Sequence, residues 1–454
     1  MPKVSVIMPC LNMEKYIRQC LNSVVCQTLK EIEIIIVDAG SKDGTLEILR
    51  EYAREDARIQ VLHSDKKSYG YQMNRGIAMA SGEYIGIVET DDFIEPDMMA
   101  VLYGKAVETG ADYVKGTGQG FYDGPGEMIW QFPIVPCRGL EENEMYVAVP
   151  KEETDLFLED NFLWNGIYRR EFIQNIKFQE TPGAAFQDIG ALFQIISSAD
   201  RGVYLRHLVY HYRQDNTSAS SYNKNGFVYA ASEYGYMEQF LRNLSVKWYT
   251  IYYLKMAGLC MDRFQVMGAS GTFWSETVAE IEALRKKLQK AVEEGTIGQE
   301  DCEAWQQSLW KELELFLKEP YRLYELHKNI YDAKKNALEQ IVDTACSQRV
   351  VLFGAGKGGQ FVHMCLALWG IVDVVAYCDN SEKIQGAVLW GCEVVSPEEA
   401  VKRESGAYFI ITAGENNARE MKAQLMALGV PKKAIGIYDK GVDRRLFHER
   451  YVRS

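Results

Sequence analysis

The first quarter of the chain alternates between two hydrophobic patterns. Short continuous apolar runs are typical of strands buried on both faces of a parallel sheet, and the segments between them carry apolar residues at helical spacing. After the first run, for example, Ile17, Leu21 and Val24 recur every three or four residues. This order predicts an α/β fold with a parallel sheet wrapped by helices. The predicted strands are Val4–Met8, Glu33–Val37, Ile59–Leu62 and Tyr84–Val88, with helices beginning at Asn12, at Ser41 or Asp43, and over Asn74–Ala80.

The fourth predicted strand runs directly into an acidic segment. Glu89, Asp91 and Asp92 follow Val88, at the strand end where open α/β sheets bind their ligands. Crowded carboxylates repel one another, and a hard divalent cation relieves that repulsion. The segment is therefore a candidate metal site. The alternative is an acidic loop that caps the next helix, and the segment taken alone slightly favours the cap.

The middle of the chain has a helical pattern. From Phe227 to about Ser347 the clear breaks are residues 268–271, residues 294–298 and Pro320. Aromatic residues gather early in this region at helical spacing, so core packing is the simplest interpretation, with an acceptor groove as the alternative. We expect a helical bundle that joins two α/β domains.

A second α/β unit begins at Arg349. The strand Arg349–Phe353 leads into a GxGxxG turn that opens a helix, and the next strand, Val372–Tyr377, ends beside Asp379. This is the arrangement of a mononucleotide-binding unit, in which glycines admit a phosphate to the backbone and the acid accepts from a ribose hydroxyl. A lone GxGxxG in about one hundred residues is weak, so ligand binding and a structural role both stay open. The turn glycines are Gly354, Gly356 and Gly359.

Composition narrows the class of protein. The 454 residues, 47% hydrophobic and 25% charged, suit a globular protein of two to four domains. A net charge of -13 argues against nucleic acid as a partner. The ten cysteines include no CxxC pair, which favours reduced thiols over disulfides or zinc. The chain opens in a strand and has no apolar run long enough to span a bilayer, so we expect a cytoplasmic protein without a transmembrane segment.

Several motifs, in order and spacing, resemble family 2 glycosyltransferases with the GT-A fold. They are VSVIMPCLN, YIRQCLNSVVCQTLKEIEIIIVDAGSKDGT, MNRGIAMASGEYIGIVETDD and IEPDM. The similarity covers about the first half of the chain, to roughly Ser221. It implies a GT-A nucleotide-diphospho-sugar transferase domain that moves a hexose from a nucleotide sugar, usually UDP-linked, to a hydroxyl acceptor with inversion.

The resemblance also implies a nucleotide pocket. Pro9 and Asn12, in the turn after the first strand, would form it together with Asp38, which would accept a hydrogen bond from a uracil ring nitrogen. Ala39 stands where family members often carry a second Asp, and this removes one polar contact. Arg75, in a predicted turn after Asn74, is a candidate for contact with phosphate or base.

The acidic segment matches the family's DxD motif, with Glu89 in place of the first Asp. The resemblance implies that Asp91 ligates Mg²⁺ or Mn²⁺ bridging the donor diphosphate, with Glu89 and Asp92 on the ribose or on metal-bound water. His211 is a further candidate metal ligand, with a structural role as the alternative. Arg213, in the same basic segment, is a candidate for a bidentate phosphate contact.

A second acidic position follows the first. Inverting members carry an acidic pair whose Asp is the general base, and here Gln187 precedes the one remaining candidate, Asp188. A helix cap is the alternative role for Asp188. Trp164 and Asn165 lie in a Trp-Asn-x-Ile-Tyr segment that lines the donor-sugar pocket in related sequences, and core packing of Trp164 is the alternative.

We therefore expect a GT-A domain over residues 1–225, a helical region over 226–345, a small Rossmann-like domain over 346–440 and a tail over 441–454. The C-terminal domain resembles those fused to sugar-modifying transferases. The expected acceptor is a glycan, a lipid-linked molecule or a protein, and a lipid-linked acceptor would bring the chain to the inner face of the membrane. A homodimer stays open.

Two other classes of function compete with a transferase. A sugar-nucleotide-binding or regulatory protein with little turnover stays open, because Ala39, Glu89 and Gln187 depart from the family pattern. An NAD-dependent oxidoreductase ranks third, because the chain shows no second half of a dinucleotide fold and no catalytic dyad for it.

Overall fold

The computed structural model describes residues 1–438 except residues 127, 142, 184, 217–222, 224, 271–273 and 372. The described residues form two compact units. The first comprises Met1–Gly120 and Phe132–Glu325, and the second comprises Phe121–Gln131 and the chain from Leu326 onward. The predicted tail over 441–454 lies outside the described residues.

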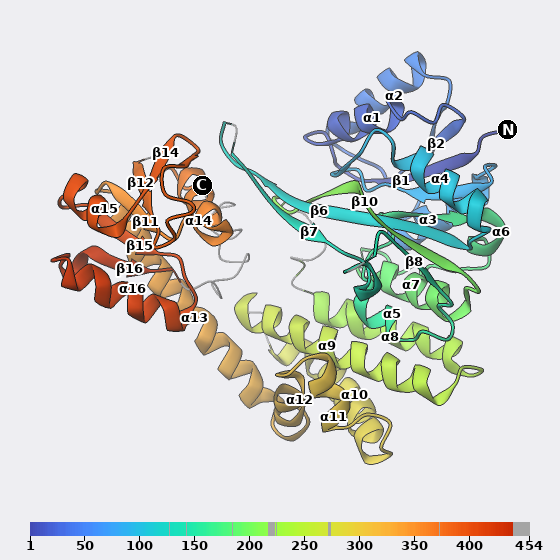
Figure 1. Cartoon of the computed structure of the whole chain (residues 1–454). Helices are drawn as coiled ribbons and strands as arrows, with labels where there is room; N and C mark the ends of the chain where they lie inside the picture. The colour runs from blue at the N-terminus through green and yellow to red at the C-terminus, as the bar shows by residue number, and fades with distance from the viewer. Residues whose placement is uncertain are drawn as a thin grey trace. The chain divides into compact units, whose positions relative to one another are not determined.

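The N-terminal part of the first unit has the predicted alternation of strands and helices (Figure 1). The elements are β1 (Val4–Cys10), α1 (Ile17–Val25), β2 (Ile32–Asp38), α2 (Thr45–Glu55), β3 (Ile59–His63), α3 (Tyr69–Met79) and β4 (Tyr84–Ile87). The four strands pair in parallel in the order β3-β2-β1-β4. Every residue of β1 and β4 is buried, which is why these strands are continuous apolar runs.

Two helix starts differ from the prediction. The third helix begins at Tyr69, so Arg75 lies inside a helix and not in a turn. Ser68 caps that helix, because its side chain accepts from the backbone N–H of Tyr71 at 3.3 Å. The first helix begins at Ile17, and Asn12 instead forms a turn with a φ of 56°, a conformation that asparagine adopts more readily than most residues.

Beyond β4 the sheet is antiparallel, so the predicted parallel sheet ends at that strand. The next elements are β5 (Phe93–Ile94), α4 (Met98–Thr109), β6 (Tyr113–Asp123), β7 (Ile129–Ile134), β8 (Met145–Ala148), α5 (Leu156–Glu159), β9 (Gly166–Arg169), α6 (Arg170–Ile173), α7 (Gln187–Ser198) and β10 (Gly202–Arg213). The sheet continues β4-β9-β6-β10-β5, with β9 antiparallel to β4 and β6. The end of β10 pairs with β5, which brings Tyr210 beside Ile94 and His211 beside Phe93.

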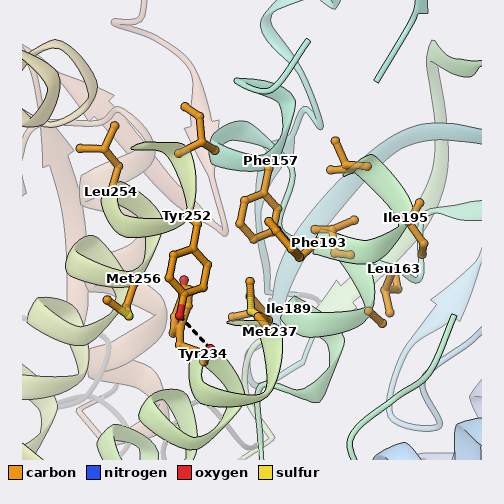
Figure 2. Close-up of a cluster of buried hydrophobic side chains, with 14 of the residues drawn as sticks. Phe157, Leu163, Ile189, Phe193, Ile195, Tyr234, Met237, Tyr252, Leu254 and Met256 are labelled. Carbon is orange, nitrogen blue, oxygen red and sulfur yellow. Dashed lines mark hydrogen bonds between the residues drawn. The ribbon is translucent and has the colours of Figure 1, made fainter. Parts of the chain in front are cut away.

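Long helices complete the first unit and lead into the second. They are α8 (Gly226–Leu241), α9 (Val246–Ser270), α10 (Trp274–Glu293), α11 (Gln299–Trp305), α12 (Leu309–Lys318) and α13 (Pro320–Ala345). Helix α8 packs between α7 and α9. Figure 2 shows the core that they share, with Phe157 of α5, Phe193 of α7, Tyr234 of α8 and Tyr252 of α9. The hydroxyl of Tyr252 donates to Tyr234 O at 2.8 Å.

This packing changes the predicted domain division. The sequence predicted a separate helical region over 226–345, but residues 226–325 group with the N-terminal domain because their aromatic side chains are buried against α5 and α7. The core interpretation of the early aromatics is therefore correct for Tyr234, Trp248 and Tyr252. Among the described residues, no helix combines the length and the apolar character needed to cross a membrane.

The second unit contains a second, smaller sheet. Its elements are β11 (Val350–Phe353), α14 (Lys357–Leu368), β12 (Val374–Cys378), β13 (Val388–Leu389), β14 (Cys392–Val395), α15 (Pro397–Arg403), β15 (Tyr408–Ile411), α16 (Glu415–Ala427) and β16 (Ile435–Ile437). The order is β13-β14-β12-β11-β15-β16, and all pairs are parallel except β13 with β14. From β11 the chain first adds β12, β13 and β14 on one side of the sheet, and it then crosses to add β15 and β16 on the other side of β11. The direction in which strands are added therefore reverses beside β11.

Candidate active site

Asp92 holds the acidic segment in place. Its side chain is 1% exposed. It accepts from the hydroxyl of Tyr210 at 2.9 Å and from the backbone N–H of Arg213 at 2.7 Å. The same Tyr210 hydroxyl accepts from the backbone N–H of Glu89 at 3.0 Å. Asp92, predicted as a metal ligand, therefore fixes the segment against β10 with both of its carboxylate oxygens.

Glu89 and Asp91 keep partial exposure. The hydroxyl of Tyr69, in the first turn of α3, donates to Glu89 Oε1 at 2.8 Å. The side-chain amide of Asn216, just after β10, donates to Asp91 Oδ2 at 2.7 Å. These contacts leave two carboxylates that are both partly exposed, so a ligand can reach either of them.

The electrostatics of the segment fit a divalent cation. Burial raises the pKa of Glu89 to about 8 and raises the pKa of Asp91 and of Asp92, and the charge of Asp91 adds to the shift of its two neighbours. Such shifts mean that the ionised forms lack compensating positive charge. Among the described residues, no group of three or more His, Cys, Asp or Glu side chains is arranged to hold an ion. Carboxylate oxygens are the ligands that Mg²⁺ and Mn²⁺ prefer, so the chemistry of Glu89 and Asp91 fits either ion.

The loops after β1 and β2 are tied to each other and to the acidic segment. The backbone N–H of Asn12 donates to Ser41 Oγ at 2.8 Å, and Asn12 Oδ1 accepts from the backbone N–H of Lys42 at 2.8 Å. The hydroxyl of Thr90 donates to Pro9 O at 2.9 Å. The loop at Asn12 is thus tied to the loop after β2, and Pro9 is tied to the candidate metal segment.

Asp38 and Arg75 are engaged with the protein itself. Asp38 is fully buried and accepts from the backbone N–H of Gly40 at 2.9 Å and from the hydroxyl of Ser41 at 2.5 Å. Its visible role is to shape the turn after β2, where Gly40 has a φ of 81°. Arg75 Nη1 donates to His63 O at 2.6 Å, which ties α3 to the end of β3. The base contact of Asp38 and the phosphate or base contact of Arg75 stay predictions.

Trp164 and Asn165 are buried. The Trp164 ring stacks on Tyr210 with centroids 4.2 Å apart, behind the hydroxyl that holds Asp92. Asn165 Nδ2 donates to Gly116 O at 3.0 Å. The burial of Trp164 and its stacking on Tyr210 fit the core interpretation of that residue, and the predicted sugar-pocket role of both residues stays a prediction.

Arg213 and His211 contact protein groups as well. Arg213 Nε donates to Asp91 O at 2.9 Å, and its Nη1 pairs with Asp215 Oδ1 at 3.1 Å. His211 Nε2 lies 2.6 Å from Glu95 Oε1. Arg213 therefore clamps the acidic segment, and His211 joins β10 to Glu95, while the phosphate contact of Arg213 and the metal contact of His211 stay predictions. Residues 217 and 218, at the end of this predicted segment, lie outside the described residues.

Asp188 lies in the first turn of α7 and remains partly accessible. It is not the helix cap, because α7 begins at Gln187 and its N-cap is Phe186. Phe186 has a φ of 72°, a left-handed conformation that costs about 1–3 kcal/mol and is found preferentially at functional sites. Burial raises the pKa of Asp188 to about 6, against the opposing effects of the Ile189 backbone N–H and of Lys255. A carboxyl group with this pKa can accept a proton near neutrality.

Gln187 links the start of α7 to the start of α3. Its Oε1 accepts from the backbone N–H of Gly70 at 3.4 Å, and its Nε2 donates to Ser68 Oγ at 3.4 Å and to Thr181 O at 2.9 Å. Tyr69, between Ser68 and Gly70, is the residue that holds Glu89. The buried amide therefore fixes Asp188 relative to the acidic segment after β4. Asp188 is also one of the charges that raise the pKa of Glu89.

A further carboxyl group, Glu233 of α8, lies behind α7. It is 2% exposed and packs against Gly190, where a Cβ would lie 1.8 Å from Glu233 Oε1. Burial raises the pKa of Glu233 to about 8, and the charge of Asp188 adds to this shift. At neutral pH, therefore, Asp188 is ionised and Glu233 is protonated. Environments that separate two pKa values in this way assign different roles to the two groups.

The predicted glycines and acid of the C-terminal unit come together at the ends of β11 and β12. Gly354 has a φ of 113°, and a Cβ on Gly359 would lie 1.8 Å from Gly354 O, so both positions require glycine. Gly356 is the N-cap of α14. Asp379 Oδ2 accepts from the backbone N–H of Ala355 at 2.9 Å, which holds the glycine turn against β12.

The sequence did not reveal three residues of the first site. Tyr210 and Asn216 lie 118 and 125 residues from the aspartates that they bind, and nothing local marks those partnerships. The burial of Glu233 could have been predicted from the sequence, because Glu233 lies on the same face of the helix as the buried residues Ala230 and Met237. An acidic residue on an apolar stripe is rarely buried without a reason.

Comparison with known proteins places these features in a class. The mixed sheet, with an acidic segment after its fourth strand and Asp188 linked to that segment through Gln187 and Tyr69, matches a glycosyltransferase domain with a GT-A-like fold. Residues 5–178 match the family model described as Glycosyl transferase family 2.

Two relatives among the proteins that this chain matches are also described as glycosyltransferases. The chain is 33% identical over 221 residues to the "Uncharacterized glycosyltransferase EpsJ" of Bacillus subtilis, covering 48% of this chain and 62% of that protein. It is 31% identical over 228 residues to the "Uncharacterized glycosyltransferase YibD" of Escherichia coli, covering 49% and 65%. It thus spans less than two thirds of these relatives. The S. aureus TarS 1-349 structure in complex with UDP-GlcNAc shares the fold, with a TM-score of 0.54 at 19% identity over 73% of this chain and 92% of that one.

The C-terminal unit matches a different family from the one expected. Residues 346–436 match the model described as C2185-like, N-terminal. The predicted resemblance to Rossmann-like domains fused to sugar-modifying transferases is therefore not confirmed, although the parallel sheet itself is present.

Proposed function

We propose that the protein is an inverting, metal-dependent glycosyltransferase that moves a hexose from a UDP-sugar to a hydroxyl acceptor. The observation that carries this proposal is the contact path between the two acidic positions. Gln187 holds the start of α7, beside Asp188, to the start of α3, where Tyr69 holds Glu89. A leaving-group site and a proton acceptor are thus fixed relative to each other, as a displacement reaction requires.

The donor end of the site belongs to the acidic segment. Asp91, oriented by Asn216, would hold Mg²⁺ or Mn²⁺, while Asp92 keeps the segment in place through Tyr210. A bound divalent cation supplies charge neutralisation to the departing diphosphate. The turns at Asn12 and Asp38 would receive the nucleoside part.

The acceptor end belongs to Asp188. In an inverting transfer the acceptor oxygen bonds to the anomeric carbon from the face opposite the diphosphate, while the bond from that carbon to the diphosphate oxygen breaks. The proton of the acceptor hydroxyl passes to the Asp188 carboxylate, and the nucleoside diphosphate leaves. Desolvation at Asp188 makes its carboxylate a stronger base than an exposed aspartate.

A panel of UDP-sugars tests the proposal directly. TarS, which shares the fold, is described with UDP-GlcNAc, so UDP-linked sugars are the first donors to test. We expect slow release of UDP from one UDP-sugar in the presence of Mn²⁺, measured by a coupled UDP assay, and faster release when a glycan, lipid-linked or protein acceptor is added. Binding of a UDP-sugar without any release would support the competing sugar-nucleotide-binding function.

The pH dependence of turnover should follow Asp188. Because its pKa is raised to about 6 and the base must be ionised, activity should rise with pH through about 6 and fall about tenfold for each unit below it. The measurement is kcat at saturating donor and Mn²⁺ between pH 5 and 8, with donor affinity followed in parallel. Undiminished kcat at pH 5 would remove Asp188 from the role of base.

A further inference from the structure

The second unit contains a pocket at the reversal point of its sheet. Its volume is about 630 Å³, within the usual range for small-molecule sites. It lies beyond the carboxyl ends of β11, β12 and β15, and its lining includes Gly356, Asp379 and Gly414. Open α/β sheets bind ligands at such a point, where strands leave the centre in opposite directions. The cavity and the strand order therefore agree on one location.

The glycine turn shapes the floor of this pocket. Gly354 and Gly359 allow the strand, the turn and α14 to approach closely, since a Cβ at either position would meet an atom at 2.7 Å or less. Gly356 differs from them, because a Cβ there would meet nothing within 4 Å. Its missing side chain serves no packing need of the protein and leaves the start of α14 open to the pocket.

The pocket wall offers groups for phosphate and ribose at separate places. Helix α14 begins at Lys357 and α16 follows Gly414, so the first turns of two helices, with their free backbone N–H groups, border the cavity. Lys357 adds a positive charge. On another side of the pocket lies Asp379. Its Oδ2 accepts from the backbone N–H of Ala355 and its Oδ1 accepts from the backbone N–H of Ser381, both at 2.9 Å. A carboxylate has about four acceptor positions, so it can still accept from hydroxyl groups.

Asp379 also restricts the kind of ribose. An acidic residue at the end of the second strand of such a unit suits a free 2′-hydroxyl and repels a 2′-phosphate. Beside it, Asn380 and Gln424 exchange two hydrogen bonds of 3.0 Å, which closes the pocket between β12 and α16.

We propose that this pocket is a second nucleotide site, which binds a ribonucleoside 5′-diphosphate with a free 2′-hydroxyl. The diphosphate lies on the turn from Gly356 to Gly359, and the ribose lies against Asp379. The ligand is ADP from the nucleotide pool or UDP of the kind released in sugar transfer, and both present the same chemistry to these groups. The site is independent of the proposed transferase activity.

The test uses the full chain with ADP and UDP as separate probes. We expect at least one of them to slow amide hydrogen exchange in residues 354–360, a region distinct from the turn at residues 38–41. Gly356→Asp should weaken this binding by about tenfold or more, because it places a carboxylate where the phosphate lies. The variant should fold normally, because the position is open and Asp is a favourable N-cap.

The matched control is Ser396→Asp. It places the same carboxylate at the N-cap of α15 in the same unit, at a residue that does not line the pocket. This control should retain nucleotide binding at residues 354–360. The proposal is overturned if neither probe at millimolar concentration slows exchange there, or if Gly356→Asp and Ser396→Asp bind alike. If UDP slows exchange at residues 38–41 and neither probe slows it at residues 354–360, the result supports the proposed donor pocket and overturns the second nucleotide site.

Discussion

Replacing Asp188 with Asn should reduce turnover by roughly 10²–10⁴-fold, because it removes the group that accepts the acceptor's proton. The change is nearly isosteric, and an amide oxygen can still accept from the backbone N–H of Ile189, which lies 3.1 Å from Asp188 Oδ1. We therefore expect donor affinity and the melting temperature to remain close to those of the unchanged protein. The measurement is kcat for UDP release beside the affinity for the UDP-sugar.

The neighbouring carboxyl group supplies a matched control. Glu233 is buried near Asp188 and has a pKa of about 8, so it is protonated at neutral pH and Glu233→Gln preserves its charge state. This variant should retain turnover within a few-fold. Near-normal turnover of Asp188→Asn would exclude Asp188 as the base. An equal loss of turnover in Glu233→Gln would show that the two carboxyl groups support the structure of the site and that Asp188 is not the proton acceptor.

The second large effect is expected at Asp91. Asp91→Ala should lower turnover by about a hundredfold or more, because the departing diphosphate loses the charge neutralisation that a metal supplies. EDTA should abolish the activity of the unchanged protein, and Mn²⁺ should restore it. The variant should need a much higher Mn²⁺ concentration or fail to respond. The measurement is a Mn²⁺ titration of UDP release for both proteins.

Glu95→Gln is the control for this prediction. Glu95 lies four residues from Asp91, and its contact is His211. If Asp91 alone of the two carboxylates meets the metal, Glu95→Gln keeps the Mn²⁺ response of the unchanged protein. Full activity in EDTA would refute metal dependence, and a shifted Mn²⁺ response in Glu95→Gln would return His211 to the list of ligands.

Local sequence predicted the fold better than it predicted the contacts of the site. The strands through Tyr84–Ile87 and the small C-terminal sheet follow from apolar runs that must be buried on both faces. The antiparallel half of the first sheet did not follow, because its pairings join segments that are far apart in the chain, such as β4 with β9.

Residue types were informative about chemistry and less so about position. The carboxylates after β4 were noticed because they follow a predicted buried strand, and Asp188 was identified through the family resemblance. Arg213 and Asp38 were assigned to ligands through the family resemblance. In the structure each is satisfied by neighbours that the sequence cannot identify, Asp215 for the first and Ser41 for the second.

The clamp formed by Tyr210, Arg213 and Asn216 has a consequence for how the site comes into being. The acidic segment emerges early in synthesis, but the groups that orient it are more than a hundred residues later. Residues 5–178 match the family, yet a fragment ending there would lack Asp188 and the whole clamp. Such a fragment could form the first parallel strands and still lack an assembled site. The proposed transferase activity therefore predicts that the smallest active piece of this chain extends past residue 216.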